Sequence, residues 1–284
     1  MKLRMWQIDA FAEQVFAGNP AAVCPLEAWL PDATLRAIAA ENNLSETAFL
    51  LRDAAGWHIR WFTPVYEVEL CGHATLASAH VVLTHLEPGA RAVTFASQSG
   101  PLTVSREPDG LLSMVFPRHV PVPGAPPPAL VRALGRAPRE AVLARDWIAL
   151  LDGEEAVRAC QPDLAAVREL PGHGLVVTAP ARSGAGLDFV SRYFAPQAGI
   201  PEDPVTGSID CALVPYWAAR LGKRRLEAFQ ASARGGRLRC EDRDDSVVIA
   251  GRTAEYLSGE DPALNPCGAL AVRGTREPRS AGAP

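Results

Sequence analysis

The fold is decided by one stretch of the chain, Phe62-Thr-Pro-Val-Tyr-Glu-Val-Glu-Leu-Cys-Gly-His-Ala-Thr-Leu-Ala-Ser-Ala-His-Val-Val-Leu83. It predicts the end of a strand, a turn at Thr63-Pro64, a loop, and then a helix that begins at Gly72. Almost every side chain of this helix is apolar or small, so we expect the helix to be buried rather than to lie on a surface. The first backbone N–H groups of a helix have no partners within it, and they favour an anion such as a ligand carboxylate or phosphate.

The same layout returns 132 residues later in the chain. Three pairs of segments match in the same order: Arg60-Trp-Phe-Thr-Pro64 with Arg192-Tyr-Phe-Ala-Pro196, Cys71-Gly-His-Ala-Thr75 with Asp203-Pro-Val-Thr-Gly-Ser208, and the segment 95–102 with 229–238. The second match opens another largely apolar run, which predicts a helix from Thr206 or Gly207 to Leu221. The chain is therefore expected to consist of two duplicated halves. Each half would bury one helix, and the two helix starts would face each other across a cleft.

Composition excludes several classes of function. The chain has 284 residues and a formal net charge of −4, and Lys223-Arg224-Arg225 is too short to form a basic surface for nucleic acid. Six widely spaced cysteines without a C-x-x-C pair are typical of a reducing compartment and argue against a zinc cluster or a disulfide framework. No apolar run approaches the roughly 18 residues of a membrane span, and Asp9 and Glu13 interrupt the N-terminus before a signal-peptide core could form. We therefore expect a cytoplasmic protein that binds neither membranes nor nucleic acid.

A proline-dense segment between Pro117 and Pro128 divides the chain. We expect a linker at about 119–128, which places one domain at 1–118 and the other at 129–274. Many strand-like stretches around one central helix in each part indicate an α+β fold with antiparallel or mixed sheets. The last strand is expected to be able to pack back on the first domain, and residues 275–284 are expected to be disordered.

Glu46 and His73 are the first candidates for acid–base chemistry. Glu46 begins a predicted strand, and its position alone favours a solvent-facing side chain, because most carboxylates stay wet. In a pocket instead, a desolvated carboxylate would suit proton transfer near neutral pH. His73 is either a satisfied histidine at a helix start or a neutral imidazole that donates to a substrate oxygen or relays a proton, since a helix N-terminus disfavours added positive charge.

Asp203 and Ser208 flank the start of the second helix. A helix cap explains them on their own, but the repeat places Asp203 opposite the turn that contains Cys71 and His73. His73 and His80 lie seven residues apart on one face of the first helix, and without a third ligand of matching type no metal site is expected there. Cys71 is a candidate nucleophile or base, but its repeat-related position holds Asp203 rather than a second thiol, which disfavours a two-thiol mechanism.

The motifs resemble those of the PhzF family of phenazine-biosynthesis isomerases, which share the diaminopimelate epimerase fold. The matching segments run in family order and are together highly specific: Asp9-Ala-Phe11, Phe16-Ala-Gly-Asn-Pro-Ala-Ala-Val23, Leu44-Ser-Glu-Thr-Ala-Phe49, Phe62-Thr-Pro64, Cys71-Gly-His-Ala-Thr75, and Asp203-Pro-Val-Thr-Gly-Ser208 with Cys211-Ala-Leu213. The resemblance covers most of the chain, from the first strand to the segment 230–236. Family members often have a histidine two residues after the Ser208 position, where this chain has Asp210.

The resemblance implies two similar domains, each a β-barrel around a central helix, with the active site between them. It also implies a homodimer and the absence of a metal or organic cofactor. By the family pattern, Glu46 is the principal acid/base residue, with His73 and Asp203 as its partners in moving a proton. The same pattern implies that Gly72, Gly207 and Ser208 bind the substrate carboxylate or carbonyl through the helix N-termini.

We therefore predict a cofactor-independent isomerase that acts in a biosynthetic process and moves a proton within a small, anionic carboxylate- or carbonyl-containing substrate by general acid/base catalysis. Two other hypotheses stay open. One is a cysteine-dependent amino-acid racemase or epimerase that uses Cys71, the position of a catalytic thiol in related epimerases and racemases. The other is a non-catalytic small-molecule binding protein on the same scaffold, for which the Asp210 departure is the main support. The sequence does not identify the substrate.

Overall fold

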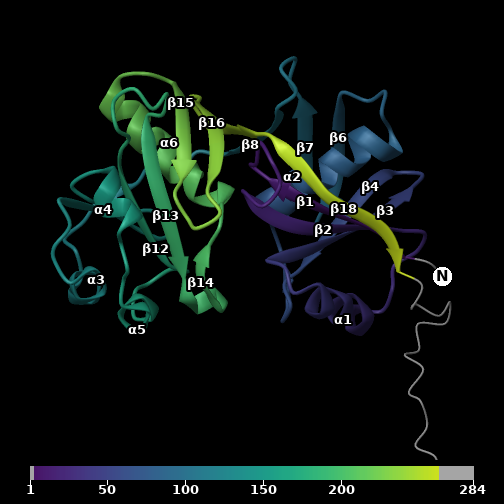
Figure 1. The fold of residues 1–284 in the computed structure, drawn as a ribbon, viewed down its shortest axis with the longest axis horizontal. Helices are drawn as coiled ribbons and strands as arrows, with labels where there is room; N and C mark the ends of the chain where they lie inside the picture. Colours follow the sequence, from purple (N-terminus) through teal and green to yellow (C-terminus); the bar gives the residue numbers. More distant parts are fainter. Residues whose placement is uncertain (1–2, 262–284) are drawn as a thin grey trace, which may run out of the picture.

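Two halves with one central helix each make up the computed structural model, which describes residues 3–261 (Figure 1). The helix of the first half is α2 (Gly72–Val81), which continues into the wider π-helical turn η1 (Val82–Leu86). The helix of the second half is α6 (Gly207–Leu221). Both are largely buried, as their apolar sequences predict, and they share one continuous hydrophobic core with the strands around them.

Strands surround each central helix. The first half contains β1 (Leu3–Ala10), β2 (Asn19–Leu26), β3 (Glu46–Asp53), β4 (Gly56–Phe62), β5 (Glu67–Val68), β6 (Ala92–Ser97), β7 (Gly100–Arg106) and β8 (Leu112–Pro117), with helix α1 (Asp32–Asn42) outside. The remaining strands are β9 (Val122–Pro123), β10 (Glu140–Leu143), β11 (Trp147–Leu150), β12 (Leu175–Pro180), β13 (Phe189–Ala195), β14 (Ile200–Asp203), β15 (Arg225–Gln230), β16 (Gly236–Asp242), β17 (Ser246–Gly251) and β18 (Thr253–Asp261). Four short helices complete the second half: α3 (Pro128–Leu134), α4 (Glu154–Arg158), α5 (Leu164–Arg168) and the 3-10 helix η2 (Pro196–Ala198).

The pairing of the strands repeats from one half to the other. In the first half β2 pairs with β3 in parallel, β3 with β4 antiparallel, β4 with β6 in parallel, and β6, β7 and β8 follow antiparallel. In the second half β11 to β17 have the same directions in the same order, with β13 pairing in parallel with β15. A parallel pair needs a crossover connection, which α2 supplies between β4 and β6 and α6 between β13 and β15. The predicted α+β fold of two pseudo-repeated halves is confirmed.

The two halves exchange their last strands. β18 follows β17 of the second half but pairs antiparallel with β1, and Figure 1 shows it crossing the first half. β9 follows β8 of the first half but pairs with β10 of the second. β8 and β17 also pair directly with each other, so the sheet runs without interruption from one half into the other. The domain boundaries 1–118 and 129–274 stay a prediction, and the expected disorder of 275–284 concerns residues outside the described range.

An equivalent Arg–Glu ion pair joins the two strands that precede each central helix. Arg60 of β4 donates from Nε and Nη2 to the two carboxylate oxygens of Glu67 in β5, both at 2.7 Å. Arg192 of β13 makes the same two-pronged contact with Glu202 of β14, at 2.7 and 2.9 Å. The arginines of the matching segments therefore make the same contact in both halves, a pair of hydrogen bonds to a glutamate of the following strand. Among the described helices, none combines the length and apolar character needed to cross a membrane.

Candidate active site

Glu46 is the first residue of β3, and its carboxylate lies against the start of α2. The side chain is 13% exposed, and its Oε2 atom is 3.1 Å from Nε2 of His73. The two groups are close enough to form an ion pair, but their orientation is not that of an aligned hydrogen bond. The solvent-facing interpretation drawn from the position of Glu46 alone is wrong, because α2 packs against this part of β3 and covers it.

Asn19, the first residue of β2, joins the two halves of the site. Its Nδ2 atom donates to Asp203 Oδ1 and to the carbonyl of Val205, both at 2.8 Å, and lies 3.3 Å from His73 Nδ1. Its Oδ1 atom accepts from the hydroxyl of Ser45 at 3.0 Å. Asn19 is completely buried, and its contacts with His73 and Val205 are buried as well, while those with Asp203 and Ser45 are partly buried. Glu46, His73 and Asp203 are thereby brought into one polar cluster that draws on both halves of the chain.

The loop before Asn19 is fixed to the second half. Gly18 has a φ of +63°, and a Cβ atom there would lie 2.1 Å from the carbonyl oxygen of Ala10, so only glycine fits. Its N–H donates to the carbonyl of Gly235 at 2.6 Å. Arg234 reaches across to the buried carboxylate of Asp9 at 2.8 Å and to the carbonyl of Gly18 at 2.9 Å. The position of Asn19 therefore depends on both halves being together.

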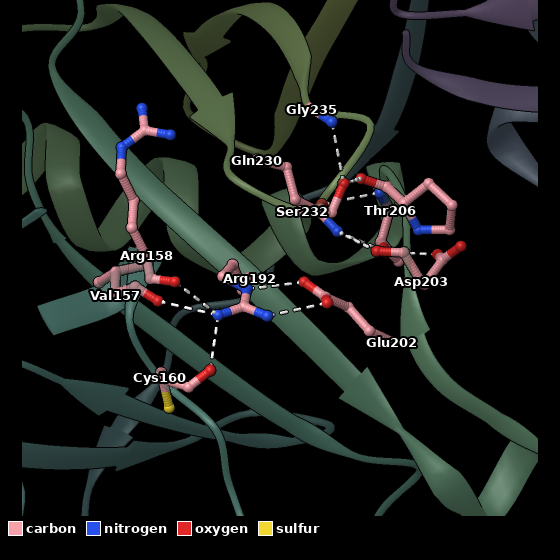
Figure 2. A network of polar contacts seen from close by, with 11 residues as sticks. Val157, Arg158, Cys160, Arg192, Glu202, Asp203, Thr206, Gln230, Ser232 and Gly235 are labelled. Carbon is pink, nitrogen blue, oxygen red and sulfur yellow. Dashed lines mark hydrogen bonds and ion pairs between the residues drawn. The ribbon is translucent and has the colours of Figure 1, made fainter. Parts of the chain in front are cut away.

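Asp203 ends β14 and is held by the residues that open α6 (Figure 2). The hydroxyl of Thr206 donates to Asp203 Oδ2 in a short contact. Gln230 binds the same corner from β15, donating to the carbonyl of Asp203 and accepting from the N–H of Thr206, each at 2.8 Å. The helix-cap interpretation of Asp203 does not describe this arrangement, because its carboxylate accepts from the side chains of Asn19 and Thr206.

Arg192 anchors the strand that carries Asp203, as Figure 2 shows. Besides its two bonds to Glu202, it donates from Nη1 to three carbonyl oxygens at the end of α4, those of Val157, Arg158 and Cys160. The side chain of Arg192 is only 7% exposed. A buried guanidinium with this many partners fixes β14 firmly, and with it the carboxylate at the end of the strand.

The protonation states follow from burial and from neighbouring charges. Burial raises the pKa of the Cys71 thiol to about 11, and the nearby Glu46 carboxylate acts in the same direction. Burial lowers the pKa of His73, but Cys71 and Glu46 outweigh it, and the net effect raises the pKa of His73 well above its usual value. This opposes the neutral imidazole expected from the helix N-terminus alone, because a carboxylate lies 3.1 Å away. Burial also raises the pKa of Asp203 to about 6.

The hydrogen-bond partners of His73 fit these states. A protonated imidazole is a donor at both nitrogens, so Nδ1 can donate to the Sγ atom of Cys71, 3.5 Å away, while Nε2 faces Glu46. Ligand atoms of Glu46, Cys71 and His73 lie within 4.8 Å of one another, a spacing that a metal ion could also occupy. The ion pair between Glu46 and His73 already accounts for this closeness, and the thiol would have to lose a proton that burial retains.

A cavity of about 100 Å³ lies at the start of α6, and none of Glu46, His73 and Asp203 lines it. Leu70, just before α2, and Ser208 and Ile209, at the start of α6, contribute to its wall, which is mostly apolar. Arg145 also lines it and lies 3.4 Å from the hydroxyl of Ser208. Ser208 thus faces this cavity, and among the described residues no hydrogen bond connects it to Glu46 or His73. The ring of Phe116 lies against Gly72, where a Cβ atom would be 3.3 Å away, and Gly207 packs near Phe11.

Asn19, Thr206, Gln230 and Arg145 were not among the residues predicted to form the site. Asn19 lies within a quoted motif, and the turn signal of Gly18 and Pro20 on either side was the clue to its fixed position. Gln230 lies within the third repeated segment. Arg145 lies in none of the quoted segments, so the sequence contained no comparable signal for it.

Comparisons with known proteins agree with the fold and show the family of the chain. A family model described as "Phenazine biosynthesis-like protein" matches residues 8–259. An uncharacterized isomerase of Pseudomonas aeruginosa is 51% identical over 259 residues, covering 91% of this chain and 98% of that protein. A human phenazine biosynthesis-like domain-containing protein is 37% identical, over 91% of this chain and 99% of its own length.

Solved structures give the same result. The crystal structure of a PhzF-family protein from Enterococcus faecalis superposes with a TM-score of 0.88 at 44% identity, covering 92% of this chain and 99% of that one. A hydroxyproline epimerase from Agrobacterium vitis has a TM-score of 0.56 at 12% identity, covering 94% of this chain and 93% of that chain. The second likeness shows a common fold, and it agrees with the epimerase-like architecture predicted from the sequence.

Proposed function

Because the chain belongs to the phenazine biosynthesis-like (PhzC-PhzF) family, we propose that it is a cofactor-independent isomerase that moves a proton within a small carboxylate- or carbonyl-containing substrate. The observation that supports this most directly is the buried pair of Glu46 Oε2 and His73 Nε2, 3.1 Å apart. Asn19 extends this pair to Asp203, so three groups able to exchange protons lie within one shielded cluster.

In this proposal Glu46 accepts the proton from a substrate carbon that a carboxylate, carbonyl or conjugated alkene activates. The amide groups at Gly72 and at Gly207 and Ser208 bind the anionic group and stabilise the charge that develops on it. His73 and Asp203 assist or return the proton elsewhere on the same molecule. A carboxyl with a pKa of about 6, such as Asp203, is well matched to this step, because both of its protonation states are accessible close to neutral pH.

We place the anionic end of the substrate in the cavity at the start of α6, which Leu70 and Phe116 of the first half also line. Its wall is mostly apolar, and its volume of about 100 Å³ suits a small ligand. Arg145 at its edge is half exposed and donates to Asp146 at 2.8 Å, and its Nη2 atom also lies 3.4 Å from the Ser208 hydroxyl, so it brings a positive charge to this cavity. The proposal also includes a homodimer in the cytoplasm, as the resemblance and the cysteine spacing imply.

The high pKa of Cys71 disfavours the alternative of a cysteine-dependent racemase. A thiol whose pKa is about 11 contains very little thiolate at neutral pH, and the thiolate is the form that abstracts a proton. The geometry does not favour the non-catalytic alternative, because Glu46, His73 and Asp203, the three groups that could exchange protons, lie in one cluster around Asn19. Both alternatives are addressed by the experiment on Glu46 below.

The experiment measures incorporation of solvent deuterium into a panel of small carboxylic acids and carbonyl compounds, using the full chain and the Glu46→Gln variant. Glutamine keeps the shape of the side chain but cannot accept the proton, so we expect exchange to fall by at least about 100-fold while the fold is retained. Glu41→Gln, an exposed glutamate on α1, is the matched control and should exchange like the parent. A Glu46→Gln variant that exchanges deuterium at the parent rate would show that Glu46 is not the base.

A further inference from the structure

A second group of potential metal ligands lies at the far end of α2, away from the candidate active site. It consists of His80 near the end of α2, His85 in the π-helical turn η1, and Glu255 on β18. Glu255 Oε2 lies 2.6 Å from His85 Nε2 and 3.8 Å from His80 Nε2. One ligand atom from each residue lies within 4.8 Å of the others. In a tetrahedral zinc site the ligand atoms are about 3.4 Å apart, so shifts of about 1 Å would complete the geometry.

The π-helical turn is what brings the two histidines together. In a regular α-helix, residues five apart are separated by about 140° around the axis and would not converge. Here the N–H of Glu87 bonds to the carbonyl of Val82, five residues back, at 2.6 Å. The wider turn rotates His85 toward His80, and their ring centroids are 6.2 Å apart. Single π-helical turns are rare in proteins, and those that occur are frequently found at functional sites.

Neighbouring residues orient each ring. Nδ1 of His80 is 2.7 Å from the hydroxyl of Thr253, so an Nδ1–H group can donate there and leave the lone pair of Nε2 facing Glu255. This second contact is the one that metal-bound histidines make, since it fixes the ring and its tautomer. The ring of His85 packs on the buried indole of Trp6, with centroids 5.6 Å apart.

Charged groups of both signs surround His80. Burial lowers the pKa of His80, and the positive charges of His85 and Arg106 contribute, while Glu255 opposes them. Arg106 is an unfavourable neighbour for a cation, and its Nη2 atom donates to the hydroxyl of Thr84 at 3.1 Å.

We propose that His80, His85 and Glu255 form a binding site for one zinc ion, with a fourth coordination position left to water. Two imidazole nitrogens and one carboxylate are a ligand set that zinc accepts in proteins. The ion would tie β18, which arrives from the second half, to the end of the first half's central helix. The site is about 10 Å along the helix from His73, and its role is structural rather than part of the proton transfer.

The test uses the full chain with any affinity tag removed, stripped of metal with EDTA and dialysed. Titration with zinc, in competition with a chromophoric chelator, measures the stoichiometry and affinity, and Co²⁺ reports tetrahedral geometry by its visible absorption. We expect one equivalent to bind. His85→Ala and Glu255→Gln should weaken binding by at least about 100-fold, and Thr253→Val by about 10- to 100-fold. Zinc should also raise the melting temperature of the parent protein but not of these two ligand variants.

Two controls make the outcome decisive. His58 forms a comparable pair with Asp53, at 3.0 Å, so His58→Ala should bind zinc like the parent. Cys71→Ser removes a ligand from the other possible group and should also leave binding unchanged. The proposal is overturned if the parent binds zinc no better than His85→Ala, or if binding is lost in Cys71→Ser and kept in His85→Ala. Should His85→Ala fail to fold, as judged by circular dichroism without metal, Glu255→Gln gives the same comparison.

Discussion

Asp210 is expected to make the protein less stable as the pH rises. It lies in the first turn of α6, is 2% exposed, and its Oδ1 atom has no hydrogen-bond partner among the described residues. Burial raises its pKa from 3.8 to about 8. Between these values the folded chain keeps a proton that the unfolded chain has lost, so stability falls with pH over this window by about 1.4 kcal/mol per pH unit.

The Asp210→Asn variant removes this titration while it keeps the size of the side chain. The free energy of unfolding of the variant minus that of the parent should therefore grow by about 4 kcal/mol between pH 5 and pH 8 and level off above. The slope is the diagnostic quantity, because the amide also lacks a partner and adds an offset that does not depend on pH. Asp203 has a raised pKa as well, but it is present in both proteins and cancels in the difference.

Urea unfolding at constant ionic strength, repeated at each pH, measures this difference. Asp244→Asn is the control, since that carboxylate is 87% exposed and its pair with Arg224 lies at the surface. The control difference should stay within about 0.5 kcal/mol over the same range. A flat difference for Asp210→Asn would refute the reasoning, because it would mean that the carboxylate ionises as easily in the folded chain as in the unfolded one.

Three further predictions follow from the contacts of the site. Asn19→Asp puts a second carboxylate beside Asp203, so the acidic limb of the exchange–pH profile should move to higher pH, whereas an unchanged profile would exclude the contact. Cys71→Ser should keep deuterium exchange within a few-fold of the parent, and alkylation of Cys71 by iodoacetamide should be slow at pH 7 and accelerate up to about pH 11. Arg192→Met should lower the free energy of unfolding by about 3–5 kcal/mol because it strands Glu202, while Arg224→Met at the surface should cost at most about 1 kcal/mol in the same urea assay.

Local sequence patterns predicted the central helices and the repeat well. The apolar run after Gly207 marks both ends of α6, and Gly222 follows directly in the left-handed conformation that ends a helix. The match between Arg60 and Arg192 reflects the same bond to a glutamate in the following strand. These features depend on neighbours close in sequence, which is why a pattern of residue types can reveal them.

The arrangement of side chains in the site could be predicted only in part. The repeat and the resemblance pointed to Glu46, His73 and Asp203. Strand alternation alone predicted that Glu46 faces solvent, because the alternation of a strand contains no information on the helix α2 that packs against it. The bridge through Asn19 to Asp203 spans 184 residues, and His85 and Glu255 are 170 apart. Such contacts depend on how distant elements pack, and no local periodicity encodes them.

The exchange of last strands explains why a site shared between two halves can be held so tightly. If the halves touched only at a surface, the distance between His73 and Asp203 would change whenever they moved relative to each other. Here β18 adds a full strand to the first half and β9 a short one to the second, and β8 pairs with β17 between them. Separating the halves would break these backbone ladders as well as the contacts of Asn19 and Arg234. A buried cluster that needs groups from both halves is therefore kept together by the backbone itself, and the proposed zinc site on β18 would add a further restraint to the same connection.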